Sequence, residues 1–77
     1  MTVIRYFAGA AHAAGRAQAT VDATGLSVAE AAQAGTDADV SRVLAVASFL
    51  LDGTLTDANA PVGQAEQLDV LPPFAGG

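Results

Sequence analysis

Apolar and polar side chains alternate over several short segments of the chain, which is the pattern of strands with one buried face. Residues 2–8 combine β-branched and aromatic side chains, and alternation places Ile4 and Tyr6 on one face. Residues 17–23 alternate small apolar and polar side chains and are predicted to pair with the first strand as a hairpin. Residues 46–51 are apolar on both faces, which indicates a central strand.

Two further strands are predicted in the second half of the chain. Asp52-Gly53 is a strong signal for a tight turn, and residues 54–57 form the short strand that returns from it. The last strand covers residues 67–71. Its inward side chains are predicted to be Leu68 and Val70, and its outward side chains Asp69 and Leu71.

One main helix is predicted between the second and third strands. Ser27 is a favourable N-cap, and Glu30 three residues later completes a capping-box pattern. The helix covers residues 28–34 and ends at Gly35. Two other segments are predicted to hold little helix: residues 9–15, a loop with one helical turn, and residues 37–41, a loop or the start of a second short helix.

The predicted order is strand, strand, helix, strand, short strand, strand and tail. This is an α+β arrangement with a mixed sheet of four to five strands. The β-grasp (ubiquitin-like) roll has this order of elements, and its last strand lies centrally, beside the first. We therefore expect one β-grasp domain over residues 1–71 and an extended C-terminal tail over residues 72–77 that leaves from the middle of the sheet.

Composition and charge narrow the possible functions. The 77 residues carry a net charge of −5, with three Arg and no Lys, which is too little positive charge to bind a nucleic-acid backbone. An acidic surface suits a basic protein partner instead. Because the chain has no Cys, it forms no disulfide and offers no thiolate for metal binding or sulfur chemistry.

No residue pattern indicates a metal site or a membrane span. His12 stands alone in a loop, and Asp37 and Asp39 are interpreted as a solvated turn. The longest apolar run, residues 43–51, is far shorter than the ~20 residues that span a bilayer. The N-terminus lacks the basic-then-apolar layout of a signal peptide. We therefore expect a cytoplasmic protein that binds neither nucleic acid nor membrane.

The last six residues combine two conformationally restricted prolines with two glycines that lack a side chain. Pro72 and Pro73 remove two backbone donors and favour extended geometry, so the last strand is predicted to stop there. Gly76 and Gly77 lack a Cβ and can enter a narrow active site. At ~3.3 Å per extended residue, this segment reaches on the order of 20 Å. The alternative is an inert, frayed end that follows a strand stop.

The segment Pro72-Pro73-Phe74-Ala75-Gly76-Gly77 resembles the Pro-Pro-hydrophobic-x-Gly-Gly terminus of the molybdopterin synthase small subunit, in the MoaD/ThiS sulfur-carrier family. Residues 5–15 resemble that family's first strand and following loop. Residues 49–53 stand where the family has a strand and an Asn-Gly or Asp-Gly turn, and residues 61–77 match its last segment without a gap. The similarity covers most of the chain, and the terminus is its sharpest motif.

The resemblance implies a non-catalytic, sulfur-donating subunit of a sulfurtransferase. In such carriers an E1-like enzyme uses ATP to adenylate the terminal carboxylate, and sulfur then replaces AMP to give a thiocarboxylate. The tail next enters the large subunit of the synthase, which holds the catalytic groups and passes the sulfur to a pterin precursor in molybdenum cofactor biosynthesis. The chain itself is expected to bind no cofactor and no metal.

The same resemblance assigns roles within the tail. Gly77 is the reacting residue, and Gly76 is the slim spacer behind it. The remainder of the inserted segment, which grips the partner, comprises Pro72, Pro73, Phe74 and Ala75.

Phe7 and Leu71 are candidate partner-binding residues. They fall on the outward faces of the first and last strands, which lie side by side in a β-grasp roll. Two exposed apolar side chains placed in this way form a docking patch for a partner protein. The alternative is an apolar sheet face without a function.

Other functions are compatible with some of the same sequence features. The same carrier chemistry serves thiamin thiazole or cysteine biosynthesis, and a ubiquitin-like modifier forms isopeptide bonds with lysines of other proteins. A β-grasp binding module with an inert tail is the alternative from a different class.

Overall fold

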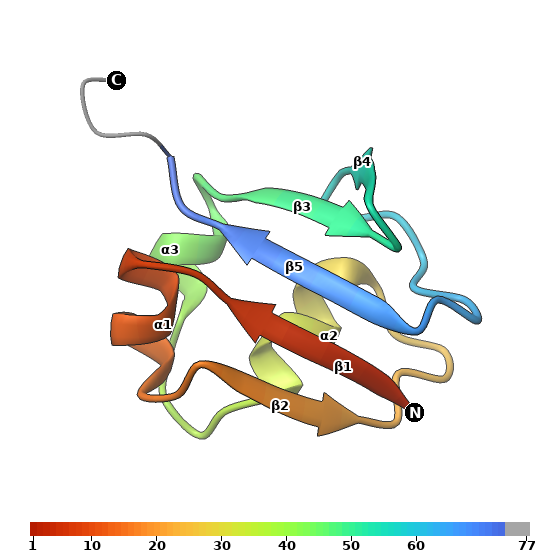
Figure 1. The fold of residues 1–77 in the computed structure, drawn as a ribbon, viewed down its shortest axis with the longest axis horizontal. Coiled ribbons are helices and arrows are strands. Elements are labelled where there is room, and N and C mark those ends of the chain that lie inside the picture. Colours follow the sequence, from red (N-terminus) through yellow and green to blue (C-terminus); the bar gives the residue numbers. More distant parts are fainter. Residues whose placement is uncertain (74–77) are drawn as a thin grey trace.

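Five short strands form one mixed sheet in the computed structural model, which describes residues 1–73. The strands are β1 (Thr2–Tyr6), β2 (Gln18–Val21), β3 (Ser48–Leu51), β4 (Thr54–Thr56) and β5 (Gln67–Leu71). Their order across the sheet is β2-β1-β5-β3-β4 (Figure 1). β1 and β5 are parallel, and the other neighbours are antiparallel. The predicted α+β class, the first hairpin and the place of the last strand beside the first are confirmed.

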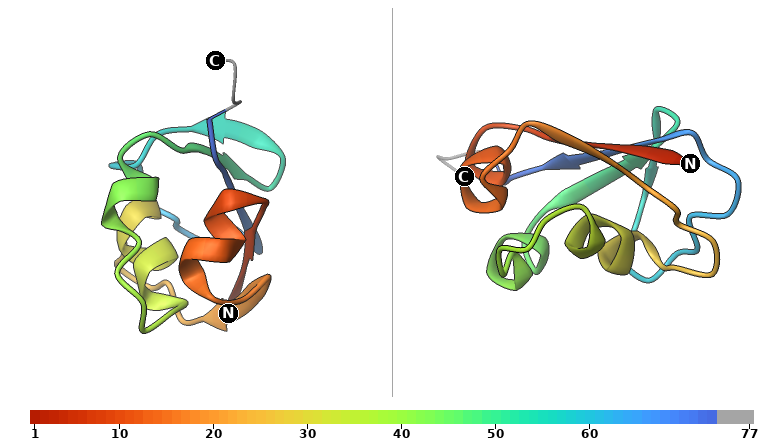
Figure 2. Two further views of the ribbon diagram at one scale, coloured as in Figure 1. Left: turned by 90° about the vertical axis from the view of Figure 1, so that its left-hand side faces the viewer. Right: turned by 90° about the horizontal axis from the view of Figure 1, so that it is seen from below.

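Within residues 1–73, three helices pack on one side or at one end of this sheet, and no helix covers its other face (Figure 2). They are α1 (Gly9–Ala14), α2 (Val28–Ala34) and α3 (Ser41–Leu44). At the start of α2 the Ser27 hydroxyl accepts a hydrogen bond from the Glu30 amide at 3.2 Å. The Glu30 carboxylate accepts one from the Ser27 amide at 2.8 Å. The predicted capping box and the bounds of this helix are therefore confirmed.

The segment before β2 is more helical than predicted: the sequence predicts a loop with one helical turn over residues 9–15, and the structure has a helix over Gly9–Ala14. Ala8 has a φ of 48° and Gly15 a φ of 75°, and these two residues with positive φ bracket α1. Alanine is the best helix former, and Ala10 and Ala14, one turn apart, are buried in the core. Without large apolar residues, the segment lacks the periodicity by which a helix is recognised in a sequence.

Several predicted strand ends also differ from the observed ones. β1 stops at Tyr6, two residues early, because Ala8 turns the backbone into α1. β2 is shorter than predicted at both ends. β3 starts at Ser48, two residues late, because Ala45 and Val46 continue the hydrogen bonding of α3 instead. At both of these junctions the adjoining helix therefore shortens the strand, although some of the residues there have a high strand propensity.

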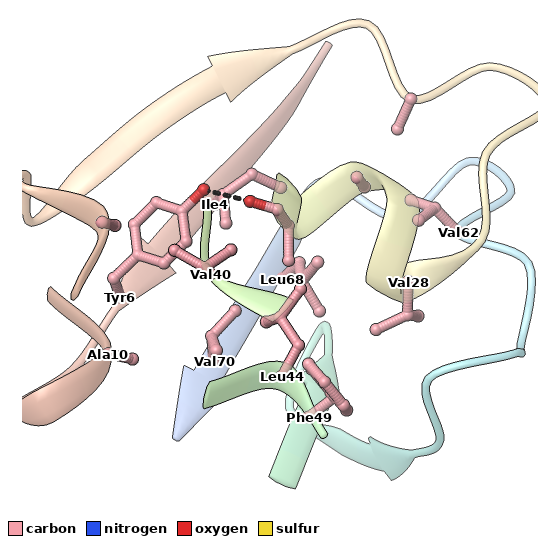
Figure 3. Close-up of a cluster of buried hydrophobic side chains, with 14 residues drawn as sticks. Ile4, Tyr6, Ala10, Val28, Val40, Leu44, Phe49, Val62, Leu68 and Val70 are labelled. Carbon is pink, nitrogen blue, oxygen red and sulfur yellow. Dashed lines mark hydrogen bonds between the residues drawn. The ribbon is translucent and has the colours of Figure 1, made fainter. Parts of the chain in front are cut away.

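The core lies between the sheet and the helices (Figure 3). Its largest fully buried side chains are Ile4, Val28, Val40, Leu68 and Val70. The inward positions predicted for Ile4, Leu68 and Val70 are confirmed, and Tyr6 is buried on the same face of the sheet. The core therefore fixes β1 and β5 as the rigid centre of the molecule.

The Tyr6 hydroxyl links the sheet to α2. It donates a hydrogen bond to the carbonyl oxygen of Ala32, drawn as a dashed line in Figure 3. Burial disfavours the phenolate and raises the pKa of Tyr6 above its ordinary value of 10.0, while the nearby Arg16 charge opposes the shift. The folded chain therefore holds this phenol in its neutral, donating form.

Alkaline pH is expected to destabilise the fold through Tyr6. Because its pKa is higher in the folded than in the unfolded chain, the stabilisation is fully present below pH 10.0 and is lost as the pH rises through the folded pKa. The sequence has one Tyr and no Lys or Cys, so phenolate absorbance reports this residue alone. We expect that absorbance to rise as the circular dichroism of the fold is lost, and Tyr6→Phe to remove the dependence. A Tyr6 that ionises at its ordinary pKa in the folded chain would contradict this prediction.

Candidate functional site

The chain leaves the sheet from its middle. β5 is the central strand, flanked by β1 and β3, and it ends at Leu71 immediately before Pro72 and Pro73. Proline has no backbone N–H with which to continue the ladder, and the predicted end of this strand is confirmed. Pro72 is half-buried, and a Cβ placed on Gly9 at the start of α1 would lie 4.0 Å from the Pro72 Cβ. The point where the chain leaves the sheet is therefore packed against α1.

The predicted reacting and inserted residues lie mostly outside the described residues. These are Phe74, Ala75, Gly76 and Gly77. Of the predicted tail, the structure places Pro72 and Pro73, the first half-buried and the second exposed. The roles assigned to the tail stay predictions.

Phe7 and Leu71 lie side by side at this exit. The Phe7 amide donates to the carbonyl oxygen of Val70 at 3.1 Å, which carries the pairing of β1 with β5 one residue past the end of β1. Both side chains are half-buried, so Phe7 is less exposed than the strand pattern predicted. The Arg5 guanidinium carbon lies 5.0 Å from the centroid of the Phe7 ring and covers part of it. The partner-binding role of Phe7 and Leu71 stays a prediction.

The face of the sheet opposite the helices, here called the outer face, extends from this exit. The registers of the strand pairs place on it Val3, Arg5, Ser48, Leu50, Leu55, Gln67, Asp69 and Leu71. Leu55 is 72% exposed, while Leu50 and Leu71 are half-buried. A partly apolar face that the described chain does not cover is typical of a protein-docking surface.

An ion pair stands at the centre of the outer face. Arg5 and Asp69 lie opposite each other in the parallel register of β1 and β5, and Arg5 Nε donates to Asp69 Oδ1 at 3.0 Å. Gln67 Nε2 donates to the same oxygen at 3.2 Å, and Leu50 lies opposite Asp69 on β3. Asp69 is consequently only 7% exposed. The predicted face for Asp69 is confirmed, but its side chain is enclosed by these neighbours rather than open to solvent.

Sequence reasoning missed this pair, although alternation along the two neighbouring strands puts both residues on outward faces. The two residues are 64 positions apart. Only the register of the parallel pair brings Arg5 opposite Asp69, and a shift of two residues in β5 would leave the same hydrophobic pattern. A search for opposite charges on adjacent outward faces is the signal that could have found it.

Of the other polar residues singled out in the sequence, Asp39 has a structural role. Hydrogen bonding to Ser41, whose amide donates to Asp39 Oδ1 at 3.0 Å, lowers the pKa of Asp39 and places this carboxylate at the start of α3. His12 lies in α1 and is exposed. Within the described part of the chain, no three His, Asp or Glu side chains gather closely enough to hold a metal ion. No helix in residues 1–73 has the length and apolarity to cross a bilayer.

These contacts define a candidate site made of three parts: the chain exit at Pro72 and Pro73, the outer face beside it, and the ion pair at the centre of that face. The outer face presents leucines, a valine, polar side chains and one ion pair. Neither a scan against protein-family models nor a search of curated proteins finds a match to this chain.

Proposed function

We propose that this chain is the sulfur-carrier subunit of a molybdopterin synthase and that the carboxylate of Gly77 carries the sulfur. The observation that supports this most is the direction of β5. The strand runs through the centre of the sheet and delivers Pro72 and Pro73 at its end, directly before the Phe-Ala-Gly-Gly sequence. The start of such a tail has a fixed position relative to the outer face, because it is attached to the rigid centre of the sheet. This attachment suits delivery of the tail into a partner's active site.

The topology supports the proposal that the domain is a β-grasp roll. The sheet order β2-β1-β5-β3-β4, with parallel central strands and α2 between β2 and β3, is compatible with that fold. The short helix α1 and the four-residue helix α3 are additions to the element order expected from the sequence. A β-grasp domain presents its last strand centrally, as a carrier of this class requires.

The chemistry that we propose takes place on the C-terminal carboxyl group. A carboxylate oxygen of Gly77 attacks the α-phosphorus of ATP on an E1-like enzyme, and pyrophosphate leaves. Hydrosulfide then attacks the acyl carbon, AMP leaves with the C–O bond electrons, and a proton is released to give the thiocarboxylate. The carrier needs no cysteine for this chemistry, and the sequence has none. The enzyme partners supply the bases and the groups that stabilise the oxyanion.

Under this proposal the synthase large subunit accepts the tail and the pterin precursor accepts the sulfur. ATP is a substrate of the activating enzyme, and the carrier itself holds no cofactor. We expect the two partner enzymes and the pterin precursor to be cytoplasmic, so the proposed function implies that this protein acts in the cytoplasm. Thiamin thiazole formation, cysteine formation and protein modification remain the alternatives, because they use the same kind of terminus.

Transfer from the loaded carrier tests the choice of acceptor. The chain carrying a Gly77 thiocarboxylate is mixed in turn with a molybdopterin synthase large subunit plus pterin precursor, with a thiazole-forming synthase and with a cysteine-forming synthase. We expect sulfur to appear in the pterin product and the carrier to return to its carboxylate form only in the first mixture. Transfer confined to the thiazole or cysteine enzyme would contradict the molybdopterin assignment, and stable adducts on lysines of other proteins would favour a modifier.

A further inference from the structure

The Arg5 side chain is held rigidly in the middle of the outer face. Its Nε atom is bonded to Asp69 Oδ1 at 3.0 Å, and its guanidinium carbon lies 5.0 Å from the centroid of the Phe7 ring. Gln67 donates to the same Asp69 oxygen and so helps to fix the carboxylate. An arginine restrained by two contacts, one to a carboxylate and one to an aromatic ring, loses less side-chain entropy than an unrestrained one when it binds a further group.

The terminal nitrogens of Arg5 are available for such a group. Among residues 1–73, the hydrogen bond recorded for this guanidinium is the one from Nε, and the Arg5 side chain is 44% exposed. The exposed part of the Arg5 side chain is open to solvent in the free chain. A protein that covers the outer face removes this solvent, and charged donors buried without an acceptor are strongly unfavourable.

We propose that Arg5 binds a carboxylate of the acceptor enzyme that takes in the tail, so that Arg5 selects this partner by charge. This inference rests on the proposed function. The acceptor enzyme is the proposed occupant because Leu71, on the outer face, directly precedes Pro72, so an enzyme that takes in the tail comes close to this face. A carboxylate is the matching group because it accepts from both Nη atoms of a guanidinium at once.

The residues around Arg5 predict the chemistry of the partner's contact surface. Leu50 and Leu55 lie on β3 and β4, and Leu71 lies on β5 next to the exit. The leucines exclude water from the contact when a partner covers them, which strengthens the ion pair at its centre. The complementary surface is therefore one Asp or Glu side chain surrounded by aliphatic side chains.

The test separates recognition by Arg5 from its contribution to the fold. In the double variant Arg5→Met/Asp69→Leu, both members of the ion pair become apolar, so no charge is left buried and unpaired and the fold is preserved. The matched control is Arg42→Met on α3, which removes an exposed Arg from the helical side of the molecule. Affinity for the synthase large subunit is measured by titration calorimetry at two salt concentrations, and unfolding is measured for each variant.

We expect the double variant to bind the large subunit about 30-fold or more weakly, and the control to bind within about threefold of the unchanged chain. The salt dependence of binding should fall in the double variant only, because it lacks the interfacial ion pair. A double variant that binds as well as or better than the unchanged chain would overturn the inference. So would a loss of affinity confined to the activating enzyme.

These outcomes differ from a failure of the proposed function itself. If the unchanged chain forms no thiocarboxylate or gives no sulfur to the pterin precursor, the proposed function fails before any variant is compared. If the unchanged chain transfers sulfur normally and the double variant also binds and transfers normally, the role of Arg5 alone is wrong.

Discussion

Removal of Gly77 is expected to abolish sulfur transfer while leaving the fold intact. The truncated chain still ends in a carboxylate, that of Gly76, but this group stands about one extended residue, ~3.3 Å, short of the reacting position. Displacement of a reacting group by even 1 Å can lower a rate about 100-fold, so we expect a loss of at least that size. The rate of thiocarboxylate formation with an activating enzyme and the rate of sulfur transfer measure it.

The control for this truncation is the stability of the domain. The core described by the structure is built from residues 4–70, so we expect the truncated chain to unfold at the same denaturant concentration as the full chain. Gly76→Ala is a second variant that keeps the length but adds a Cβ, and we expect it to slow transfer because it widens the tail. Equal rates for the full and the truncated chains would contradict a reaction at Gly77.

Substitution of Gly35 by Ala is expected to destabilise the domain by about 3 kcal/mol. The backbone at Gly35 is helical, with a φ of −76°, so the cost is not conformational. The added Cβ would overlap the Tyr6 hydroxyl oxygen and approach the Ala19 Cβ to 3.3 Å. It would therefore displace the tyrosine from Ala32, whose carbonyl oxygen would lose its partner. Chemical denaturation of the purified variant measures the effect, which is large for a domain of this size.

A double variant identifies the cause of that loss. Tyr6→Phe removes the hydroxyl that the new Cβ would meet, so Gly35→Ala should cost much less in the Tyr6→Phe background than in the original chain. An unchanged cost in that background would show that the overlap with Tyr6 is not the reason.

Local sequence signals predicted the parts of this fold that depend on neighbouring residues. The spacing of Ser27 and Glu30 predicted the capping box and the start of α2. Asp52 and Gly53 predicted the turn between β3 and β4, and both have the positive φ angles, 48° and 83°, that such a turn requires. Alternation along β5 predicted which of its side chains enter the core.

The missed features depend on contacts between distant parts of the chain. Helix α1 is stabilised by burial of Ala10 and Ala14 in a core built by other elements, and small side chains give no periodic signal of that burial. The enclosure of Asp69 depends on Arg5, which lies 64 positions away in the sequence. The position of the chain exit could be predicted, because two prolines end β5 wherever that strand lies.

Under the proposed carrier function, we expect the partners to recognise the outer face as well as the tail. The two terminal glycines offer no side chains for recognition, so contacts with the domain would add to the grip on Pro72, Pro73 and Phe74. The leucines of the outer face provide contact area, and the Arg5–Asp69 pair provides a polar feature at its centre. We expect the two partners that handle Gly77 in turn to dock on this same face and therefore to exclude each other.

Formation of a thiocarboxylate on Gly77 is tested by intact mass spectrometry of the full chain after incubation with an E1-like activating enzyme, ATP and a sulfide source. We expect a mass increase equal to the replacement of one oxygen by one sulfur, located by fragmentation at Gly77 and absent when ATP is omitted. An unchanged mass, with an activating enzyme that loads a known carrier in a parallel reaction, would contradict it.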